Sequence, residues 1–189
     1  MNETVAAIEN EIKKLNTAGC IIAIDGRCAS GKSTLAKELS NVLDCNIVHM
    51  DDFFLQPAQR TQARLNEAGG NIDYERFLTE IAIPLKQGKN LCYRRFDCHS
   101  FGFSDEIKPK QKKITIIEGT YSCHPRFADI YDLKIFLDAD SAEQLSRIEK
   151  RNGKKQLSVF KDKWIPLEER YFRELHIKEK CDISFKLKF

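Results

Sequence analysis

The stretch that most constrains the fold of this chain covers residues 21–34 and reads IIAIDGRCASGKST. Its first four residues are apolar and mostly β-branched, which favours a buried strand. Residues 26–33 then match the pattern G-x-x-x-x-G-K-[ST], and a helical pattern follows them. A strand, this glycine-rich turn and a helix, in that order, are the context in which the pattern forms a phosphate-binding P-loop. The sequence therefore predicts an α/β fold with an anion site where its first strand ends.

The residue types of this loop suit the phosphates of a nucleotide. Gly26 and Gly31 let the backbone turn successive N–H groups inward, and the following helix directs its positive end to the same place. Lys32 would bring a charge to the β- and γ-phosphates, and the Ser33 hydroxyl would take one position around Mg²⁺. The expected nucleotide-binding residues are Gly26, Arg27, Cys28, Ala29, Ser30, Gly31, Lys32, Ser33 and Thr34.

Composition narrows the class of protein. The chain has 189 residues and a net charge of only +3, with basic and acidic residues interspersed, which argues against a nucleic-acid-binding surface. No apolar run is long enough to span a bilayer, and the amphipathic N-terminal segment lacks the apolar core of a signal peptide. We therefore expect one cytoplasmic domain, monomeric or homo-oligomeric, with a small-molecule partner and no membrane or nucleic-acid partner.

Cysteine usage agrees with a reducing compartment. The seven cysteines are scattered and form no C-x-x-C pair, which argues against a disulfide framework and against a zinc site. Cys28 differs from the others because it lies in the phosphate loop near a helix N-terminus, where the thiolate form is favoured. We expect Cys28 to be sensitive to oxidation.

Strand-like and helical segments alternate along the rest of the chain. Apolar runs at residues 46–50, 114–117, 133–137 and 182–187 read as further strands, and helical patterns separate them. Alternation of this kind predicts a doubly wound, mostly parallel sheet. The predicted architecture is a P-loop NTPase-type three-layer sandwich with helices on both faces, formed by a single domain of residues 1–189. Within it we expect an N-terminal helix in residues 1–18, a substrate-binding insert at 53–104 and a lid at 147–165.

Three carboxylates follow predicted strands. Asp51 and Asp52 come after the second strand, and Glu118 ends the third one. Ligands of open α/β sheets collect beyond the carboxyl ends of strands, so these groups would lie near the P-loop if the strands are neighbours. Glu118 would then hold a water of the Mg²⁺ shell, together with Ser33. The alternatives are that an aspartate caps a turn and that Glu118 only meets solvent.

Among the classes of P-loop protein, the residues outside the P-loop favour a small-molecule kinase. The guanine-reading motif N-K-x-D of GTPases is absent from the sequence. A kinase needs a carboxylate near the acceptor hydroxyl, a pocket for the acceptor and basic residues over the transferring phosphoryl group. Asp51 and Asp52, the aromatic-rich insert, and Arg147 and Arg151 supply these three features.

Several segments then resemble a known family. They are residues 26–34, 51–54 (DDFF), 71–73 (NID), 117–119 (IEG) and 132–151. Their order is similar to that of the uridine kinase and phosphoribulokinase group of P-loop kinases, which includes nicotinamide riboside kinase and a bacterial pantothenate kinase. The resemblance covers most of residues 20–151, and its D-x-F-[FY] and I-E-G elements are more specific than the P-loop.

The resemblance implies ATP- and Mg²⁺-dependent transfer of the γ-phosphoryl group to a primary hydroxyl, commonly the 5′-hydroxyl of a nucleoside. By position Asp51 is similar to the family's general base, Asp73 to its ribose ligand, and Arg147 and Arg151 to its lid arginines. We therefore expect Lys32, Asp51, Arg147 and Arg151 to be catalytic. The expected acceptor contacts are Asp52, Phe53, Asp73, Phe96 and His99.

One difference from the family's sequence pattern leaves the identity of the acceptor undecided. Uridine-cytidine kinases carry P-x-Y-D-F-x-x-H where the base is read, whereas this chain has YRRFDCH at residues 93–99, with Phe96 in the tyrosine's place. Phe96, His99 and Phe101 could instead be core and turn residues. Nicotinamide riboside or pantothenate thus stays open as the acceptor. So does a regulatory nucleotide-binding protein that has lost its acceptor site.

Overall fold

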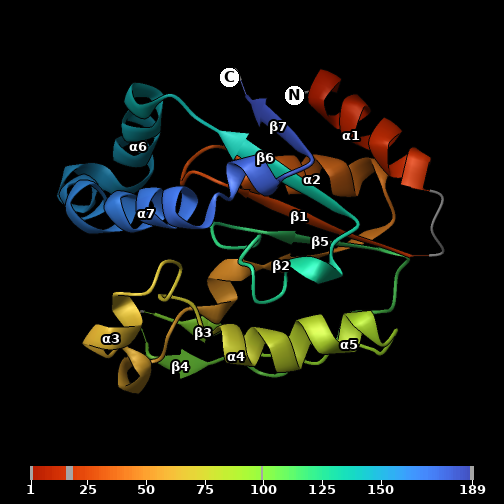
Figure 1. Cartoon of the computed structure of the whole chain (residues 1–189), viewed down its shortest axis with the longest axis horizontal. Coiled ribbons are helices and arrows are strands. Elements are labelled where there is room, and N and C mark those ends of the chain that lie inside the picture. The colour runs from red at the N-terminus through yellow and green to blue at the C-terminus, as the bar shows by residue number, and fades with distance from the viewer. Residues whose placement is uncertain (1, 16–18, 99, 188–189) are drawn as a thin grey trace.

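The computed structural model describes residues 2–15, 19–98 and 100–187. Its centre is a five-stranded sheet in the order β2-β5-β1-β6-β7, in which all neighbouring strands run parallel (Figure 1). The strands are β1 (Cys20–Gly26), β2 (Cys45–His49), β5 (Ile114–Glu118), β6 (Leu133–Asp138) and β7 (Ile183–Lys186). The predicted parallel sheet is thereby confirmed. One strand, β5, lies between β1 and β2, so the strand that precedes Asp51 is not a direct neighbour of the P-loop strand.

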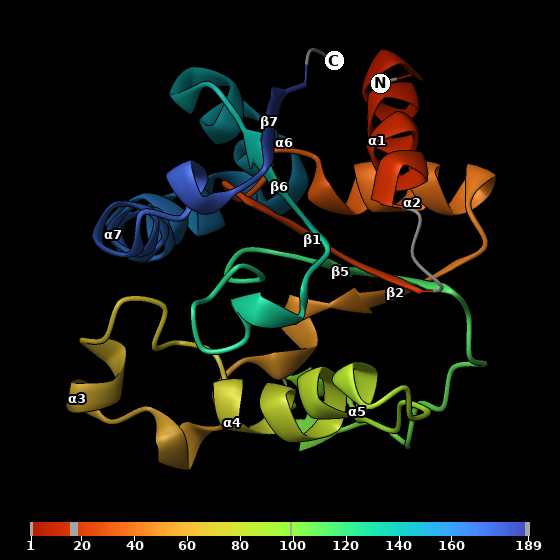
Figure 2. The ribbon, with the colours of Figure 1, turned by 45° about the vertical axis from the view of Figure 1, so that its right-hand side comes forward.

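Alternate side chains of the strands build two cores, one on each face of the sheet. Ile22 and Ile24 of β1 pack with α1 (Asn2–Leu15) and α2 (Lys32–Val42), whereas Ala23 belongs to the core on the opposite face. That second core also holds side chains of α4 (Tyr74–Phe77), α5 (Ile83–Lys86) and α7 (Ile165–Leu175). Figure 2 shows α1 and α2 on one side of the sheet and α4 and α5 on the other. Both faces are covered, which explains why the strands are apolar along their length.

The helices begin and end where local chemistry requires. Asp73 caps α4 by accepting from the Arg76 N–H at 3.0 Å, and Asp140 caps α6 (Ser141–Val159) by accepting from the Ala142 N–H at 3.1 Å. Gly153, with φ of 80°, interrupts α6. A proline inside a helix commonly kinks or ends it, but the backbone stays helical at Pro84 of α5, which follows the π-helical stretch η3 (Leu78–Ala82). A second π-helical stretch, η5 (Phe160–Trp164), joins α6 to α7.

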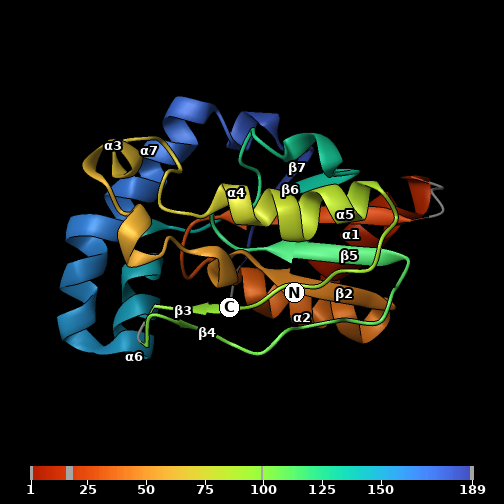
Figure 3. The same cartoon turned by 90° about the horizontal axis from the view of Figure 1, so that it is seen from below.

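The predicted insert lies on one side of the sheet, below it in Figure 1 and toward the viewer in Figure 3. Three short elements open it: η1 (Met50–Phe53), η2 (Pro57–Gln59) and α3 (Gln62–Leu65). The helical run α4-η3-α5 follows, and a small hairpin of β3 (Phe96–Asp97) and β4 (Gly102–Phe103) completes it. Two short helices, η4 (Ala128–Ile130) and η6 (Lys178–Lys180), precede β6 and β7. Among the described residues, no helix is both long and apolar enough to cross a membrane.

A buried histidine joins the insert to the second core, and it yields a prediction on stability. The His124 ring stacks between Tyr74 and Tyr171, and its Nδ1 accepts from the Arg126 N–H at 3.2 Å. Burial, and then the charge of Arg126, lowers the pKa of His124 to about 4. An unfolded histidine titrates near pH 6.5, so protons bind preferentially to the unfolded chain between pH 6.5 and 4.

The free energy of unfolding should therefore fall as the pH drops through this window, by on the order of 3 kcal/mol from His124. Urea unfolding at pH 7.5 and pH 4.5 measures the fall. His124→Phe keeps an aromatic ring but cannot titrate, so its stability should change less between the two pH values. An equal fall in the variant would contradict the assignment.

Candidate active site

The P-loop has the geometry that its glycines predict. Gly31 (φ 100°) is the N-cap of α2, and Gly26 has φ of 132°, a conformation that side chains rarely adopt. A Cβ on Gly26 would lie 2.1 Å from the backbone oxygen of Leu137, so the loop packs directly against β6. The Lys32 ammonium folds back along the loop and donates to the Gly26 and Arg27 carbonyl oxygens, each at 2.8 Å. These bonds hold the charged group at the centre of the loop.

A buried carboxylate fixes the base of this loop. Asp25 is fully buried and accepts from the backbone N–H groups of Gly26, Tyr121 and Cys123 at 2.6, 3.1 and 2.8 Å. It also accepts from the Tyr171 hydroxyl at 2.7 Å. One side chain thus ties the P-loop to the segment after β5 and to α7.

Hard oxygen ligands meet beside the P-loop lysine. The Ser33 hydroxyl donates to Glu118 Oε1 at 3.0 Å, and the same oxygen lies 2.6 Å from His49 Nδ1. The hydrogen bond to Glu118 is the largest cause of the raised His49 pKa. Gly119 lets β5 and β2 approach here, because a Cβ on it would lie 2.8 Å from the Met50 Cβ.

The donor set of this corner fits Mg²⁺. A hydroxyl and one carboxylate are the few protein ligands that Mg²⁺ takes while it keeps waters and binds phosphate oxygens. Among residues 2–15, 19–98 and 100–187 there is no group of three or more His, Cys, Asp or Glu side chains that could hold a metal ion by itself. A metal at Ser33 and Glu118 would therefore need the phosphates of a nucleotide to complete its shell.

One cavity of about 1120 Å³ runs from the P-loop to the insert. A single small-molecule pocket has about 300–1000 Å³, so this volume suits a nucleotide and an acceptor together. Its lining comes from the P-loop, the end of β5, the insert, and α6 to α7. The lining residues include Lys32, Ser33, Thr34, Asp51, Phe54, Leu55, Arg60, Asn71, Cys98, Glu118, Tyr121, Arg147, Arg151, Trp164 and Glu168.

The two adjacent aspartates have different surroundings. Asp51 lines the cavity and is exposed within it, although protein surrounds it closely enough that loss of solvation raises its pKa. The charge of Lys32 acts against this rise, and that of Glu118 adds to it. Asp52 lies outside the cavity lining, with one carboxylate oxygen 3.5 Å from Arg95 Nε. Only Asp51 can reach an acceptor from this position.

The two predicted lid arginines lie on α6, and one of them contacts the P-loop. Arg147 donates to the Ala29 carbonyl oxygen at 3.0 Å and forms an ion pair with Glu143. Arg151 lines the cavity one turn further along α6, and its charge is among those that lower the pKa of Asp51. Arg27, by contrast, directs its guanidinium away from the loop, to Asp138 at 2.8 Å.

The expected thiolate at Cys28 is wrong. Burial, and then the charge of the nearby Glu168 carboxylate, raise the pKa of this thiol to about 12. Glu168 comes from α7, is buried, and accepts from the Cys28 N–H at 3.0 Å. The helix N-terminus does not compensate for this neighbour, so Cys28 is a protonated, poorly reactive thiol.

Three further residues predicted to contact the acceptor lie outside the cavity lining. Phe53 is fully buried and packs edge-to-face on Phe77. Asp73 is buried at the start of α4, where its second oxygen accepts from the Gln59 amide at 2.9 Å. Phe96 is buried against Phe103 in the hairpin. His99 lies outside the described residues.

Comparison of this chain with known proteins identifies its family. The model of the phosphoribulokinase / uridine kinase family matches residues 21–159. The chain belongs to this family. It is 27% identical over 145 residues to uridine kinase-like protein 3 of Arabidopsis thaliana, and the match spans 70% of this chain but only 30% of that protein. The solved structure of a possible uridine kinase from Bacillus stearothermophilus is similar in fold, with a TM-score of 0.73, 20% identity, and coverage of 97% and 98% of the two chains.

Family membership and the parallel sheet give this chain the fold of P-loop kinases. The resemblance inferred from the sequence is thus confirmed.

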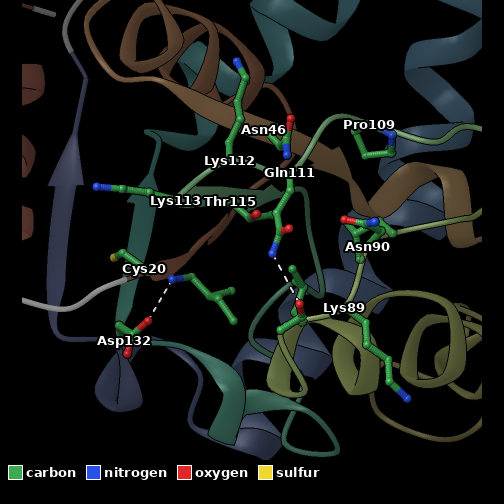
Figure 4. A pocket seen from close by; sticks show the side chains of 15 residues that line it. Cys20, Asn46, Lys89, Asn90, Pro109, Gln111, Lys112, Lys113, Thr115 and Asp132 are labelled. Carbon is green, nitrogen blue, oxygen red and sulfur yellow. Dashed lines mark hydrogen bonds between the residues drawn. The ribbon is translucent and has the colours of Figure 1, made fainter.

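A smaller cavity of about 480 Å³ lies at the opposite edge of the sheet, where β1, β2 and β5 begin (Figure 4). Gln111 donates to the Gly88 carbonyl oxygen at 3.3 Å, and Asp132 accepts from the Ile21 N–H at 2.8 Å. The P-loop lines the other cavity, at the carboxyl ends of the strands, where ligands of open α/β sheets bind. The larger cavity is therefore the candidate active site.

The roles of several residues of the site could not be predicted from the sequence. His49 contacts Glu118 because β2 and β5 pair with these two residues in register. Thr120 donates to the Gly26 carbonyl oxygen at 3.0 Å and lies 3.2 Å from the Lys32 ammonium. For both, a polar residue at the end of an apolar strand was the only signal. No signal in the sequence indicated Glu168, because only tertiary packing brings α7 to the P-loop.

Proposed function

We propose that this chain transfers the γ-phosphoryl group of ATP to a primary hydroxyl of a small molecule, with the 5′-hydroxyl of a nucleoside-like compound as the acceptor. One observation carries the proposal: Lys32, Ser33 and Asp51 line the same cavity, so the phosphate site and a carboxylate face each other across space for an alcohol. Nicotinamide riboside and pantothenate are the alternative acceptors.

The side chains divide the reaction between them. Lys32 stabilises the charge that develops on the transferring group, and Arg147 and Arg151, which line the same cavity, add to this stabilisation. Asp51 orients the acceptor hydroxyl and accepts its proton as the phosphorus–oxygen bond forms. Ser33 and Glu118 would hold Mg²⁺, which neutralises the phosphate oxygens when it is bound.

ADP release from ATP and Mg²⁺ tests the proposal, measured with uridine, cytidine, nicotinamide riboside or pantothenate as the acceptor. We expect release above the rate without acceptor for one of them, together with its phosphorylated product. A regulatory nucleotide-binding protein would bind ATP but give no acceptor-dependent release. That outcome would leave Asp51 without a role and would contradict the proposed function.

A further inference from the structure

The insert places an arginine in the cavity with no acidic partner. Arg60 follows η2 and lines the cavity with Leu55 and Cys98. Its Nε donates to the Leu55 carbonyl oxygen at 3.0 Å, and its Nη2 lies 3.8 Å from the Cys98 sulfur. Within residues 2–15, 19–98 and 100–187, no carboxylate lies within ion-pair distance of Arg60. These neutral contacts orient the guanidinium but leave its charge uncompensated.

Three of the other four arginines of the insert differ in this respect. Arg64 lies 2.7 Å from Glu75, Arg76 lies 3.5 Å from Glu80, and Arg95 lies 3.5 Å from Asp52. Each of these three serves an ion pair within the protein. Arg60 alone among the five arginines of the insert lines the cavity.

Arg60 also lies on the acceptor side of the site. Asp51, Arg60 and Cys98 all line this cavity. Burial raises the pKa of the Cys98 thiol, and the charges of Arg60 and Asp51 both act on it as well, so the thiol is near both the guanidinium and the proposed base. An acceptor whose hydroxyl reaches Asp51 would have another part of its structure beside Arg60.

We infer that the acceptor carries an anionic group, a carboxylate or a phosphate, which Arg60 binds away from the reacting hydroxyl. This inference rests on the proposed function. A guanidinium forms two parallel hydrogen bonds to either anion, and these bonds are stronger than those to a neutral oxygen. The charge of Arg60 would also offset the repulsion between Asp51 and an anionic acceptor. Arg60 is thus the residue that sets acceptor specificity.

Matched acceptors test the inference, because each pair differs at one position, which carries an anionic group in one member and a neutral group in the other. The pairs are uridine and orotidine, pantothenol and pantothenate, and ribulose and ribulose 5-phosphate. For one pair at least, we expect kcat/KM of the native protein to be higher with the anionic member. Orotidine and pantothenate test whether the site recognises a carboxylate, and ribulose 5-phosphate tests whether it recognises a phosphate.

Arg60→Gln should lower kcat/KM for the preferred anionic acceptor by about 10- to 100-fold, the loss expected for a charged hydrogen bond. It should leave the neutral member and KM for ATP nearly unchanged. Arg60→Lys keeps the charge and should restore part of the preference. The matched control is Arg173→Gln, which removes an exposed guanidinium of α7 outside the cavity and should change neither acceptor.

Calorimetric titration of the six compounds into the ADP-bound protein measures their binding even where no phosphoryl transfer occurs. The inference is overturned if the neutral members are preferred, or if they bind as tightly as the anionic members. It is also overturned if Arg60→Gln weakens the binding of both members of a pair equally. Transfer to neutral acceptors alone, insensitive to Arg60, would overturn it and leave the proposed function standing. Arg60-dependent binding of anionic members without transfer to any compound would instead contradict the proposed function.

Discussion

Replacing Asp51 by Asn should lower kcat by about 10²- to 10⁴-fold, the usual contribution of a general base. The amide keeps the size of the side chain and can still contact the acceptor hydroxyl, but it cannot accept the proton. Asp51 lies on η1, and within the described residues it forms no hydrogen bond or ion pair with the P-loop, so ATP affinity should be retained. Steady-state kinetics and an ATP titration of the same variant measure the two effects.

Asp52→Asn provides the matched comparison for this variant. It removes the same charge one residue away, from a side chain outside the cavity lining that lies beside Arg95. Its loss of kcat should be much smaller than that of Asp51→Asn. Equal turnover of Asp51→Asn and the native protein would remove the base role from Asp51.

The pH dependence of the reaction should report the same residue. Loss of solvation raises the pKa of Asp51 above that of an ordinary aspartate. A base is inactive when protonated, so kcat/KM should fall as the pH drops through this raised pKa. The acid limb would then lie at a higher pH than a free aspartate gives.

Replacing Lys32 by Ala should weaken ATP binding and lower kcat by about 10²- to 10³-fold, as for other groups that stabilise transition-state charge. The ammonium is held by the Gly26 and Arg27 carbonyl oxygens and lies 3.2 Å from the Thr120 hydroxyl, so it is positioned before any ligand binds. An ATP titration and steady-state rates together check both effects.

Lys37→Ala controls for the loss of a lysine from the same helix. Lys37 is exposed on α2 and does not line the cavity, so its removal should leave both quantities unchanged. An unaltered ATP titration of Lys32→Ala would contradict the phosphate site itself.

Local chemistry, readable from the sequence, determined the outline of this molecule. The order of residues 26–33 sets the loop because only glycines tolerate its backbone angles, and apolar strands buried on both faces specify a parallel sheet. The caps at Asp73 and Asp140 and the break at Gly153 were likewise predictable, because each depends on hydrogen bonds or dihedral angles within a few residues.

Tertiary structure alone decided which side chains face the cavity. Asp51 and Asp52 are adjacent and chemically identical, yet the backbone of η1 turns only the first into the site. Glu168 approaches the P-loop from 140 positions away and raises the pKa of Cys28, against the effect of the helix N-terminus. Pairing of His49 with Glu118 and exposure of Arg60 to the cavity depend in the same way on packing between distant segments. The physical reason is that burial and charge at a site sum over neighbours in space, which local sequence patterns do not contain.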